Sequence, residues 1–505
     1  MNRGPDAVST ARGVSYLWLQ NVVSSVARIV AFAFFARLIS VEQMGVFTIL
    51  SLAYSAASAF MGLGMSSIVT KFVAEDIAKG EKEEAASVYY NALLLSELAS
   101  VLIAGAFLVS KFPAGVSHLP YSPAILLIGI LFAIDVAASI GPTAAAAFYG
   151  LLEFRDYAVI YATIYGVLRP WLVVLLIYLV KSLVGLVGAW IISDSVLAVY
   201  VFLYLWRKLG PPVFRFDRKY LLKLSCPLYL ATLASFMYGT FDQLTLIPLV
   251  PLTALGVYGA TVTAYSAYYG LVAVLGTVLL PVFSGVHGAK GPEVLENSVR
   301  TASRYVSLVA MPMAFALLAT ARPALTLLVG RSYEGGALPL AVLALASTAS
   351  IVALSLSPIL IVLNETLLAA LTAILPLPFS VAVALISIPT LGILGAAIAR
   401  GLSMVLGLLL TSYFVRRKIS ADLDYQAIIK SVAASGTMAL TMEAVQLLYY
   451  SRFLLPLYLV VGALVYLLAM RALRAMNTAD IELLRHTLGP RSGRISDLLS
   501  RLVVR

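Results

Sequence analysis

The sequence predicts an all-α protein that crosses a membrane many times. Hydrophobic residues make up 61% of its 505 residues and charged residues only 12%, whereas a soluble protein carries about 25% charged residues. The mean hydropathy is +0.97. The apolar residues are gathered in runs of ~20 or more, the length that crosses a ~30 Å hydrocarbon core as a helix. Since helices satisfy their own backbone hydrogen bonds there, an ordinary soluble fold is excluded.

About fourteen such runs can be placed along the chain. The expected spans are residues 14–38, 44–68, 86–110, 122–148, 157–180, 183–206, 223–248, 254–281, 300–320, 337–361, 366–388, 391–415, 427–449 and 453–473. The tail after the last span contains Asp480–Arg485 and Ile495–Arg505. We expect these segments to form one or two short amphipathic helices at an anionic membrane surface, or a passive interfacial anchor.

The basic residues orient these spans. Of the 35 Lys and Arg residues, 26 lie in the two terminal segments and in every second loop, and 6 lie in the other loops; the remaining ones are Arg28, Arg169 and Arg400, inside spans. Positive charge collects on the cytoplasmic side of a membrane. We therefore expect a multi-pass protein of the cytoplasmic membrane with both termini inside the cell.

Signs of catalysis are lacking in the sequence. The single cysteine excludes a disulfide framework, and the three histidines, His118, His287 and His486, are far apart and lack zinc-site spacing. There is no P-loop, nucleophile elbow or long outer loop. We expect no enzyme, metal or cofactor. The charged residues behind the net charge of +11 lie mainly in short loops between the spans, so we expect no nucleic-acid partner. We also expect a monomer.

The chain repeats itself once. Met44–Ala56 matches Leu255–Ala267 at an offset of 211, and Val184–Ala189 matches Leu391–Ala396 at an offset of 207. Spans 1–6 and 7–12 are therefore expected to be copies in the same orientation, an arrangement found in transporters. The domains expected from this repeat are a first six-helix bundle at 1–210, a second at 211–418, two further spans at 419–475 and the tail at 476–505.

Several apolar, glycine-containing segments resemble one known family. They are Ala36–Phe47, Gly62–Glu75, Leu224–Leu228, Phe241–Leu244, Leu255–Tyr258, Leu280–Ser284, Leu328–Tyr333 and Gly395–Ala399. In order and spacing they resemble the polysaccharide transporter, or Wzx-type flippase, branch of the superfamily that also contains MATE exporters and MurJ lipid II flippases.

The resemblance implies two six-helix bundles around a central cavity, with alternating access by a rocker switch. It also implies a lipid-linked oligosaccharide as the substrate, on a polyprenyl or dolichyl phosphate or pyrophosphate carrier. The expected partners are this glycan, membrane lipids, a proton or sodium ion, and glycan-assembly enzymes. A MATE-like, cation-coupled exporter of amphipathic molecules and a non-transporting scaffold remain alternatives.

Charged residues inside the spans are the candidate site. An ionised group at the bilayer centre costs at least ~2.5 kcal/mol, so a lipid-facing position is excluded for them. Three arginines suit the phosphate of a lipid carrier, because a guanidinium binds phosphate with several donors; they are Arg28, Arg169 and Arg400. Three carboxylates are candidates for ion coupling: Glu97, Asp135 and Asp194. Alternatively, these groups form buried ion pairs that fix the helix register.

One pair of charges is expected to form a gate. At the offset of 211, Asp242 corresponds to Ala31, about 3 residues and ~4.5 Å of helix rise from Arg28. We predict that Arg28 and Asp242 pair across the repeat axis when the outer side is closed. Alternatively, Arg28 pairs with Glu97 or Asp135 in its own bundle.

Three tyrosines lie close together in the eighth expected span, namely Tyr265, Tyr268 and Tyr269. Their rings and hydroxyls could contact sugars. The alternative is ordinary helix packing and interfacial anchoring.

Overall fold

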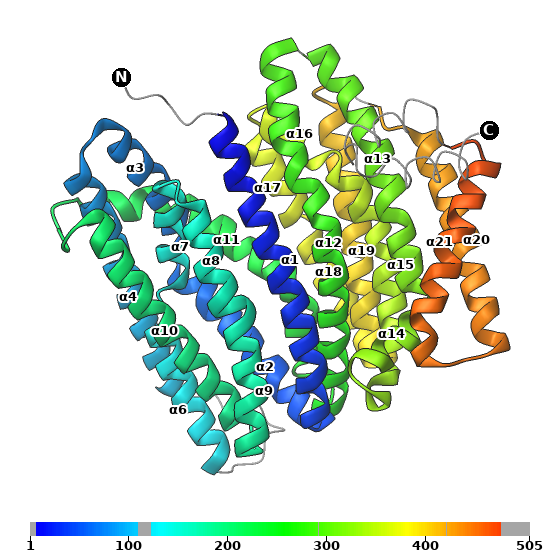
Figure 1. Cartoon of the computed structure of the whole chain (residues 1–505), viewed down its shortest axis with the longest axis horizontal. Helices are drawn as coiled ribbons and strands as arrows, with labels where there is room; N and C mark the ends of the chain where they lie inside the picture. The colour runs from blue at the N-terminus through cyan, green and yellow to red at the C-terminus, as the bar shows by residue number, and fades with distance from the viewer. Residues whose placement is uncertain (1–6, 110–122, 291, 421, 476–505) are drawn as a thin grey trace. The chain divides into compact units, whose positions relative to one another are not determined.

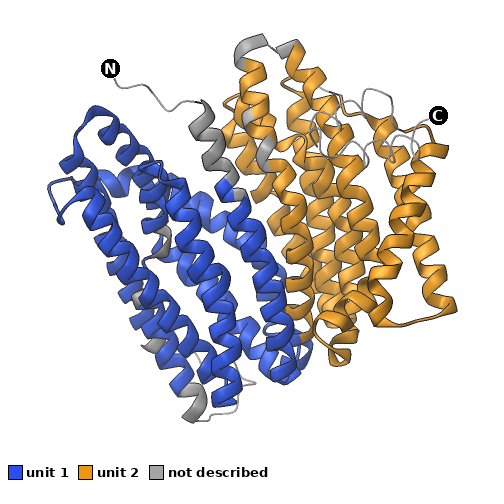
Figure 2. Ribbon diagram, in the orientation of Figure 1, with its two compact units in different colours: residues 1–256 blue, residues 257–505 orange. Residues whose placement is uncertain are grey.

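The chain folds into helices that form two compact units. The computed structural model describes residues 7–109, 123–290, 292–420 and 422–475, and its regular elements are all helical. Unit 1 is Met1–Gly256 and unit 2 is Val257–Arg505 (Figures 1 and 2). The expected tail at 476–505 lies outside the described residues.

Unit 1 consists of long helices interrupted at defined points. Its elements are α1 (Ala7–Leu38), α2 (Val41–Met61), α3 (Met65–Lys79), α4 (Lys82–Val109), α6 (Pro123–Ala138), α7 (Gly141–Gly150), α8 (Phe154–Tyr161), the π-helix η1 (Ala162–Leu168), α9 (Arg169–Val180), α10 (Val184–Leu209), α11 (Arg218–Leu246) and the start of α12 (Leu252–Lys290). A core of buried apolar residues joins α3, α4, α7 and α10.

The second expected span, 44–68, is broken in the structure. The helix stops at Met61 and resumes at Met65 because Leu63 and Gly64 adopt positive φ angles of 44° and 69°. Only glycine takes that conformation readily. A Cβ at Gly64 would also stand 2.7 Å from the carbonyl oxygen of Ser225, so α11 packs directly against this break.

The loop between α10 and α11 is fastened to α4. The Ser87 hydroxyl accepts hydrogen bonds from the backbone amides of Arg215 (3.0 Å) and Phe216 (2.8 Å). The Arg218 guanidinium donates to Asn91 at 2.8 Å. These hydrogen bonds attach the start of α11 to α4, and α11 belongs to unit 1. In the sequence repeat, by contrast, α11 is the first helix of the second copy.

Unit 2 contains the rest of α12 and the remaining helices. These are α13 (Pro292–Ala319), α14 (Ala321–Leu328), the short 3₁₀ helix η2 (Arg331–Gly336), α15 (Ala337–Leu354), α16 (Ser357–Val362), α17 (Thr366–Ile374), α18 (Pro376–Leu391), α19 (Ile393–Arg416), α20 (Tyr425–Leu448), the 3₁₀ helix η3 (Arg452–Leu454) and α21 (Leu455–Ala472). The last two long helices, α20 and α21, pack on each other around Met438, Met442 and Tyr458.

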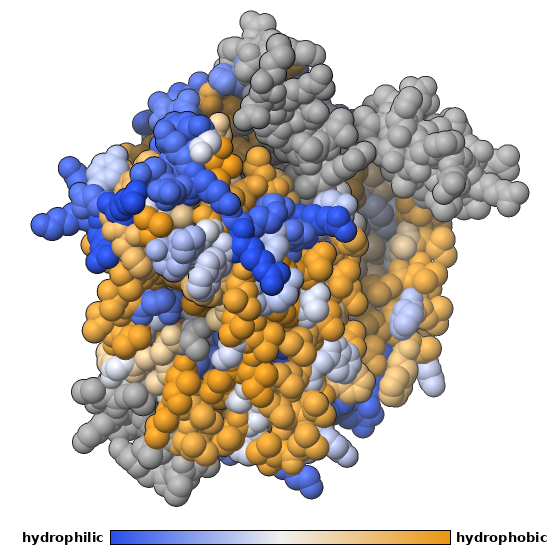
Figure 3. Space-filling view, turned by 60° about the vertical axis from the view of Figure 1, so that its left-hand side comes forward, coloured by the Kyte–Doolittle hydropathy of each residue, from blue (hydrophilic) through white to orange (hydrophobic). Residues whose placement is uncertain are grey.

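The helices confirm a polytopic membrane protein. Within the described ranges, 11 helical stretches are long and apolar enough to cross a membrane. The other three expected spans coincide with α6 followed by α7, with α12 and with α20. Figure 3 shows hydrophobic residues over much of the face in view, with hydrophilic residues gathered toward its upper end. The number of fourteen spans stays a prediction.

Candidate functional site

The centre of unit 1 holds a buried ion pair. Nη1 of Arg169, at the start of α9, lies 2.8 Å from Oδ1 of Asp194 on α10. The Asp194 side chain is 1% exposed and that of Arg169 14%. The Tyr54 hydroxyl from α2 donates to Asp194 Oδ2 at 2.9 Å and accepts from Arg169 Nη1 at 3.4 Å. Both oxygens of the Asp194 carboxylate are therefore occupied.

Aromatic rings surround the guanidinium. Its central carbon lies 4.8 Å from the ring centroid of Tyr54, 5.2 Å from that of Tyr165 and 5.1 Å from that of Trp190. Cation–π contacts at these distances stabilise a cation that has left water. Arg169 is thus held by a carboxylate, a hydroxyl and three rings, which leaves it poorly placed to meet a ligand in this structure.

Asp135 adds a second carboxylate to the cluster. It lies on α6 and is 0% exposed, and neither of its oxygens has a hydrogen-bond partner among the residues that the structure describes. It interacts electrostatically with both Asp194 and Arg169. With both carboxylates ionised, the three side chains carry one net negative charge, which a single proton or monovalent cation would neutralise. We call Tyr54, Asp135, Arg169 and Asp194 the buried polar cluster.

Local backbone structure positions Arg169. The preceding residues, Ala162–Leu168, form a π-helix, and Pro170 follows at the first turn of α9. π-helical turns are rare and often occur at functional sites. A Cβ at Gly166 would stand 2.2 Å from Ser24 Oγ, so this segment packs closely against α1.

Arg28 contrasts sharply with Arg169. It lies on α1 and its side chain is exposed. Its guanidinium donates to the Ser24 carbonyl oxygen at 3.2 Å and to the Ser25 hydroxyl at 3.4 Å, both on its own helix. No carboxylate within the described residues forms a salt bridge with it. An exposed arginine in the middle of an apolar span requires a polar surrounding.

Two further candidates of unit 1 lie on α4 and α11. Glu97, on α4, has a buried Oε1 without a hydrogen-bond partner in the described part of the chain. Asp242, on α11, is 0% exposed. The structure gives no ion pair between Asp242 and Arg28. Pairing of these two residues during transport stays a prediction, which a charge swap tests.

The tyrosine candidates lie on α12, in unit 2, and are mostly packed inside. Tyr265 and Tyr268 are 3% and 8% exposed. Tyr265 stacks on Tyr269 with ring centroids 5.7 Å apart, and the Tyr268 hydroxyl lies 3.0 Å from Ser347 Oγ. This packing favours a structural role for Tyr265 and Tyr268. Tyr269 is half-buried and Arg400, on α19, likewise.

Tyr54, Tyr165 and Trp190 were not predicted from the sequence. A tyrosine or tryptophan in an apolar run has no distinctive signal. One signal was present for Tyr54, since it matches Tyr265 at the offset of 211.

The arrangement defines a class of protein. Charged groups are buried inside a helical membrane bundle, and an arginine within a span has no acidic partner among the described residues. Both features are typical of a membrane transporter or flippase.

A family comparison agrees with this class. The sequence model of the family described as "Polysaccharide biosynthesis protein" matches residues 10–287, so the chain belongs to this family. Among curated protein sequences, none matches the chain.

Solved structures show the same fold. The lipid II flippase MurJ in an inward closed conformation superposes with a TM-score of 0.72 at 16% identity, covering 91% of this chain and 98% of that one. An inward-facing multidrug resistance MATE family transporter of the MOP superfamily gives 0.60 at 18% identity, covering 79% and 95%. A Vibrio cholerae MATE transporter gives 0.58 at 15% identity, covering 82% and 99%. These structures show the fold of the chain, and the family match confirms the expected polysaccharide family.

Proposed function

We propose that the chain flips a lipid-linked oligosaccharide, carried on a polyprenyl or dolichyl phosphate or pyrophosphate, across the cytoplasmic membrane by alternating access. The polysaccharide biosynthesis family supports a glycan substrate. The observation that carries the proposal is the exposed guanidinium of Arg28, which lacks an acidic partner among the described residues. A free cation inside the membrane suits an anionic phosphate ligand.

The two arginines of unit 1 then have different roles. Arg28 is available to bind the carrier phosphate, whereas Arg169 is occupied by Asp194 and Tyr54. Arg400 remains a further phosphate-binding candidate and Tyr269 a candidate sugar contact. Glu97 stays a candidate for ion coupling, in addition to Asp135 and Asp194.

The buried polar cluster is the proposed coupling site. Asp135 is fully buried without a hydrogen bond to any residue in the described ranges. An ionised carboxylate in such surroundings carries a large desolvation cost that proton or cation binding removes. The Arg169 guanidinium already neutralises one of the two carboxylates, that of Asp194. A proton or sodium ion taken up by the cluster would neutralise the second negative charge and so alter the attraction between Arg169 and each carboxylate.

Contacts inside each unit support the proposed repeat. In unit 1 the hydroxyl of Tyr54 donates to Asp194, and in unit 2 that of Tyr265 lies 3.9 Å from the sulfur of Met404. The two tyrosines are 211 residues apart and their partners 210. Two parallel six-helix repeats plus two further spans, with fourteen spans and cytoplasmic termini, are part of the proposal.

The hairpins of α9 with α10 and of α18 with α19 agree as well. A Cβ at Gly185 would stand 2.6 Å from the carbonyl oxygen of Leu176, and one at Gly395 would stand 2.4 Å from that of Ser387. These glycines are 210 residues apart, which is closer to the offset of 211 than the sequence match at 207. The domains 1–210, 211–418, 419–475 and 476–505 follow from this repeat.

A flipping assay tests the function. Wild-type protein in proteoliposomes should move a labelled lipid-linked sugar between leaflets, and the Arg28→Ala variant should lose most of that activity. Arg28→Lys, which keeps the charge but loses the fork of donors, should lose less. Flipping by Arg28→Ala at the wild-type rate would contradict the role of Arg28, and a wild-type protein without flipping would contradict the function.

The alternative is a MATE-like exporter of amphipathic cations. It is favoured by the carboxylate pair of Asp135 and Asp194 and by the fold shared with multidrug transporters. Competition for binding between a polyprenyl-phosphate glycan and a cationic dye distinguishes the two, because Arg28 should repel the dye.

A further inference from the structure

The first turns of α2 and α12 cross at unusually short range within unit 1. A Cβ built on Gly45 would stand 2.2 Å from the carbonyl oxygen of Leu252. One built on Gly256 would stand 2.1 Å from the carbonyl oxygen of Val41. Carbon and oxygen atoms in contact are ordinarily about 3.3–3.6 Å apart. Only glycine on both helices therefore permits this approach.

The crossing is symmetric in the sequence as well as in space. Gly45 and Gly256 are 211 residues apart, and so are Val41 and Leu252. Each glycine touches the carbonyl oxygen four residues before the other glycine. The contact is thus made by equivalent positions of the two proposed repeats.

Capping hydrogen bonds restrain the first turn, and prolines precede the second. α2 begins with a capping box, in which Ser40 Oγ accepts from the Gln43 amide at 3.1 Å and Gln43 Oε1 accepts from the Ser40 amide at 2.9 Å. The loop before α12 contains Pro248 and Pro251, which restrict its backbone. An added methyl group would therefore push the helices apart rather than be absorbed by a flexible loop.

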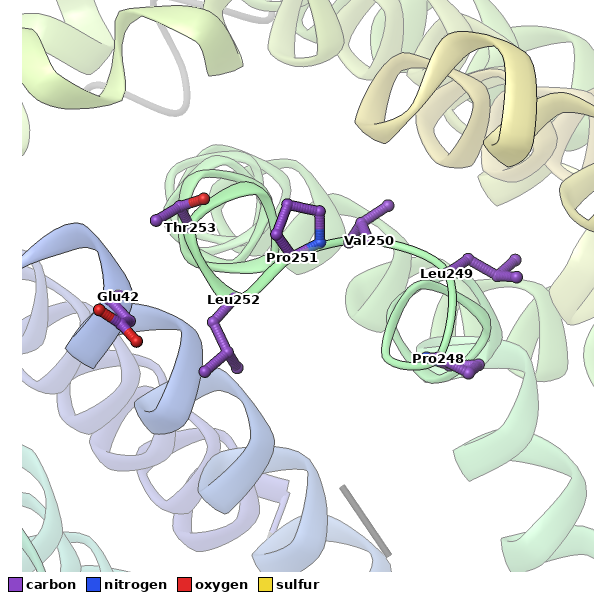
Figure 4. A pocket seen from close by; sticks show the side chains of 7 residues that line it. All are labelled: Glu42, Pro248, Leu249, Val250, Pro251, Leu252 and Thr253. Carbon is purple, nitrogen blue, oxygen red and sulfur yellow. The ribbon is translucent and has the colours of Figure 1, made fainter. Parts of the chain in front are cut away.

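A cavity of about 610 Å³ adjoins the crossing. It is lined by Glu42 and residues 248–253, and Figure 4 shows the loop from α11 to α12 with Leu252 near the helix that carries Glu42. Leu252 both lines the cavity and supplies the carbonyl oxygen at Gly45. Separation of the two turns would widen this cavity.

We propose that the Gly45–Gly256 crossing is the outer gate of the transport cycle: the two helix turns meet when the outer side is closed and part when it opens. The side of the membrane rests on the proposed function and its orientation. The two glycines act as positioning residues for transport, because their missing side chains allow the closed state. Alanine at either position favours the open state.

Cysteine labelling tests the gate. In a Cys226→Ala background, Met44→Cys and Leu255→Cys introduce reporters that are 0% and 1% exposed in the native structure. Gly256→Ala is combined with the reporter on α2, and Gly45→Ala with the reporter on α12, so that variant and reporter lie on opposite helices. An impermeant maleimide added outside should label these variants about tenfold faster than the parent, a shift of ~1.4 kcal/mol.

Matched controls isolate the crossing. Gly239→Ala and Gly270→Ala place the same methyl group where, among the described residues, no heavy atom beyond the neighbouring residues and backbone of its own helix lies within 4 Å. They should leave the labelling rate unchanged. Equal acceleration in these controls, or unchanged labelling in both crossing variants, overturns the gate. Leu249→Cys, at an exposed position of the cavity, reports the side: labelling only from the cytoplasm overturns the outer assignment.

A second arm covers poor folding of the alanine variants. Val41→Cys together with Leu252→Cys keeps both glycines, and a short, cleavable bifunctional thiol reagent should abolish flipping until it is cleaved. Unchanged flipping in the cross-linked protein overturns the gate. Wild-type protein that fails to flip the glycan while the labelling pattern holds refutes the proposed function but retains the gate.

Discussion

Neutralising Asp194 should destabilise the protein strongly. Asp194→Asn removes the charge that balances Arg169, whose guanidinium lies 2.8 Å away in a position that is 14% exposed. Leaving one partner of a buried pair uncompensated costs about 3–5 kcal/mol. Since Asp135 also interacts with Arg169, we expect the lower end, about 3 kcal/mol. The free energy of unfolding in mixed detergent micelles measures it.

A double-mutant cycle separates the pair from its surroundings. Arg169→Leu and Asp194→Leu should each destabilise the protein, whereas the double variant should recover to within about 1 kcal/mol of the wild type, because two apolar side chains replace two buried charges. A coupling energy under about 0.5 kcal/mol would refute the reasoning. The folded double variant should also have lost the dependence of flipping on a proton or sodium gradient.

Further predictions concern the gate pair, the orientation and the loop. Arg28→Asp and Asp242→Arg should each impair flipping, and the double variant should recover part of it; strictly additive losses would contradict the pair. Cysteines at Lys82 and Thr253 should react only from the cytoplasmic and only from the outer side, respectively, and the reverse pattern would invert the topology. Ser87→Ala should reduce stability by about 1–3 kcal/mol, because two backbone amides lose their acceptor, and should speed hydrogen exchange there; unchanged exchange would argue against fastening.

The sequence predicted where helices lie better than where they break. Apolar runs fix the spans, since the bilayer demands a minimum length. The break at Gly64 depends on α11 packing against it, and the π-helix before Arg169 depends on α1 packing against Gly166. Such tertiary contacts leave no periodic signal in the chain.

For the site, the sequence identified charges but could not pair them. Arg28 and Arg169 both lie near the middle of an apolar span in the sequence. In the structure, however, Arg28 is exposed, whereas Arg169 is enclosed by Asp194 and three aromatic rings. Which helix faces turn toward each other decides this difference. Hydropathy does not show which helix faces pack together. Tyr54 could therefore be recognised as a site residue only from its match to Tyr265 in the repeat.

Helix α11 belongs to the second repeat by sequence but packs in the first unit of the structure. By the repeat, α11 opens the second copy, yet its contacts with α2 and α3 and the bonds from Ser87 and Asn91 place it in unit 1. The bond between residues 210 and 211 is therefore not what holds it there. A chain expressed as two fragments, divided in this loop, should reassemble through that interface. The covalent link that joins the two units runs instead through α12, which is where a fused or split reporter would sense their motion.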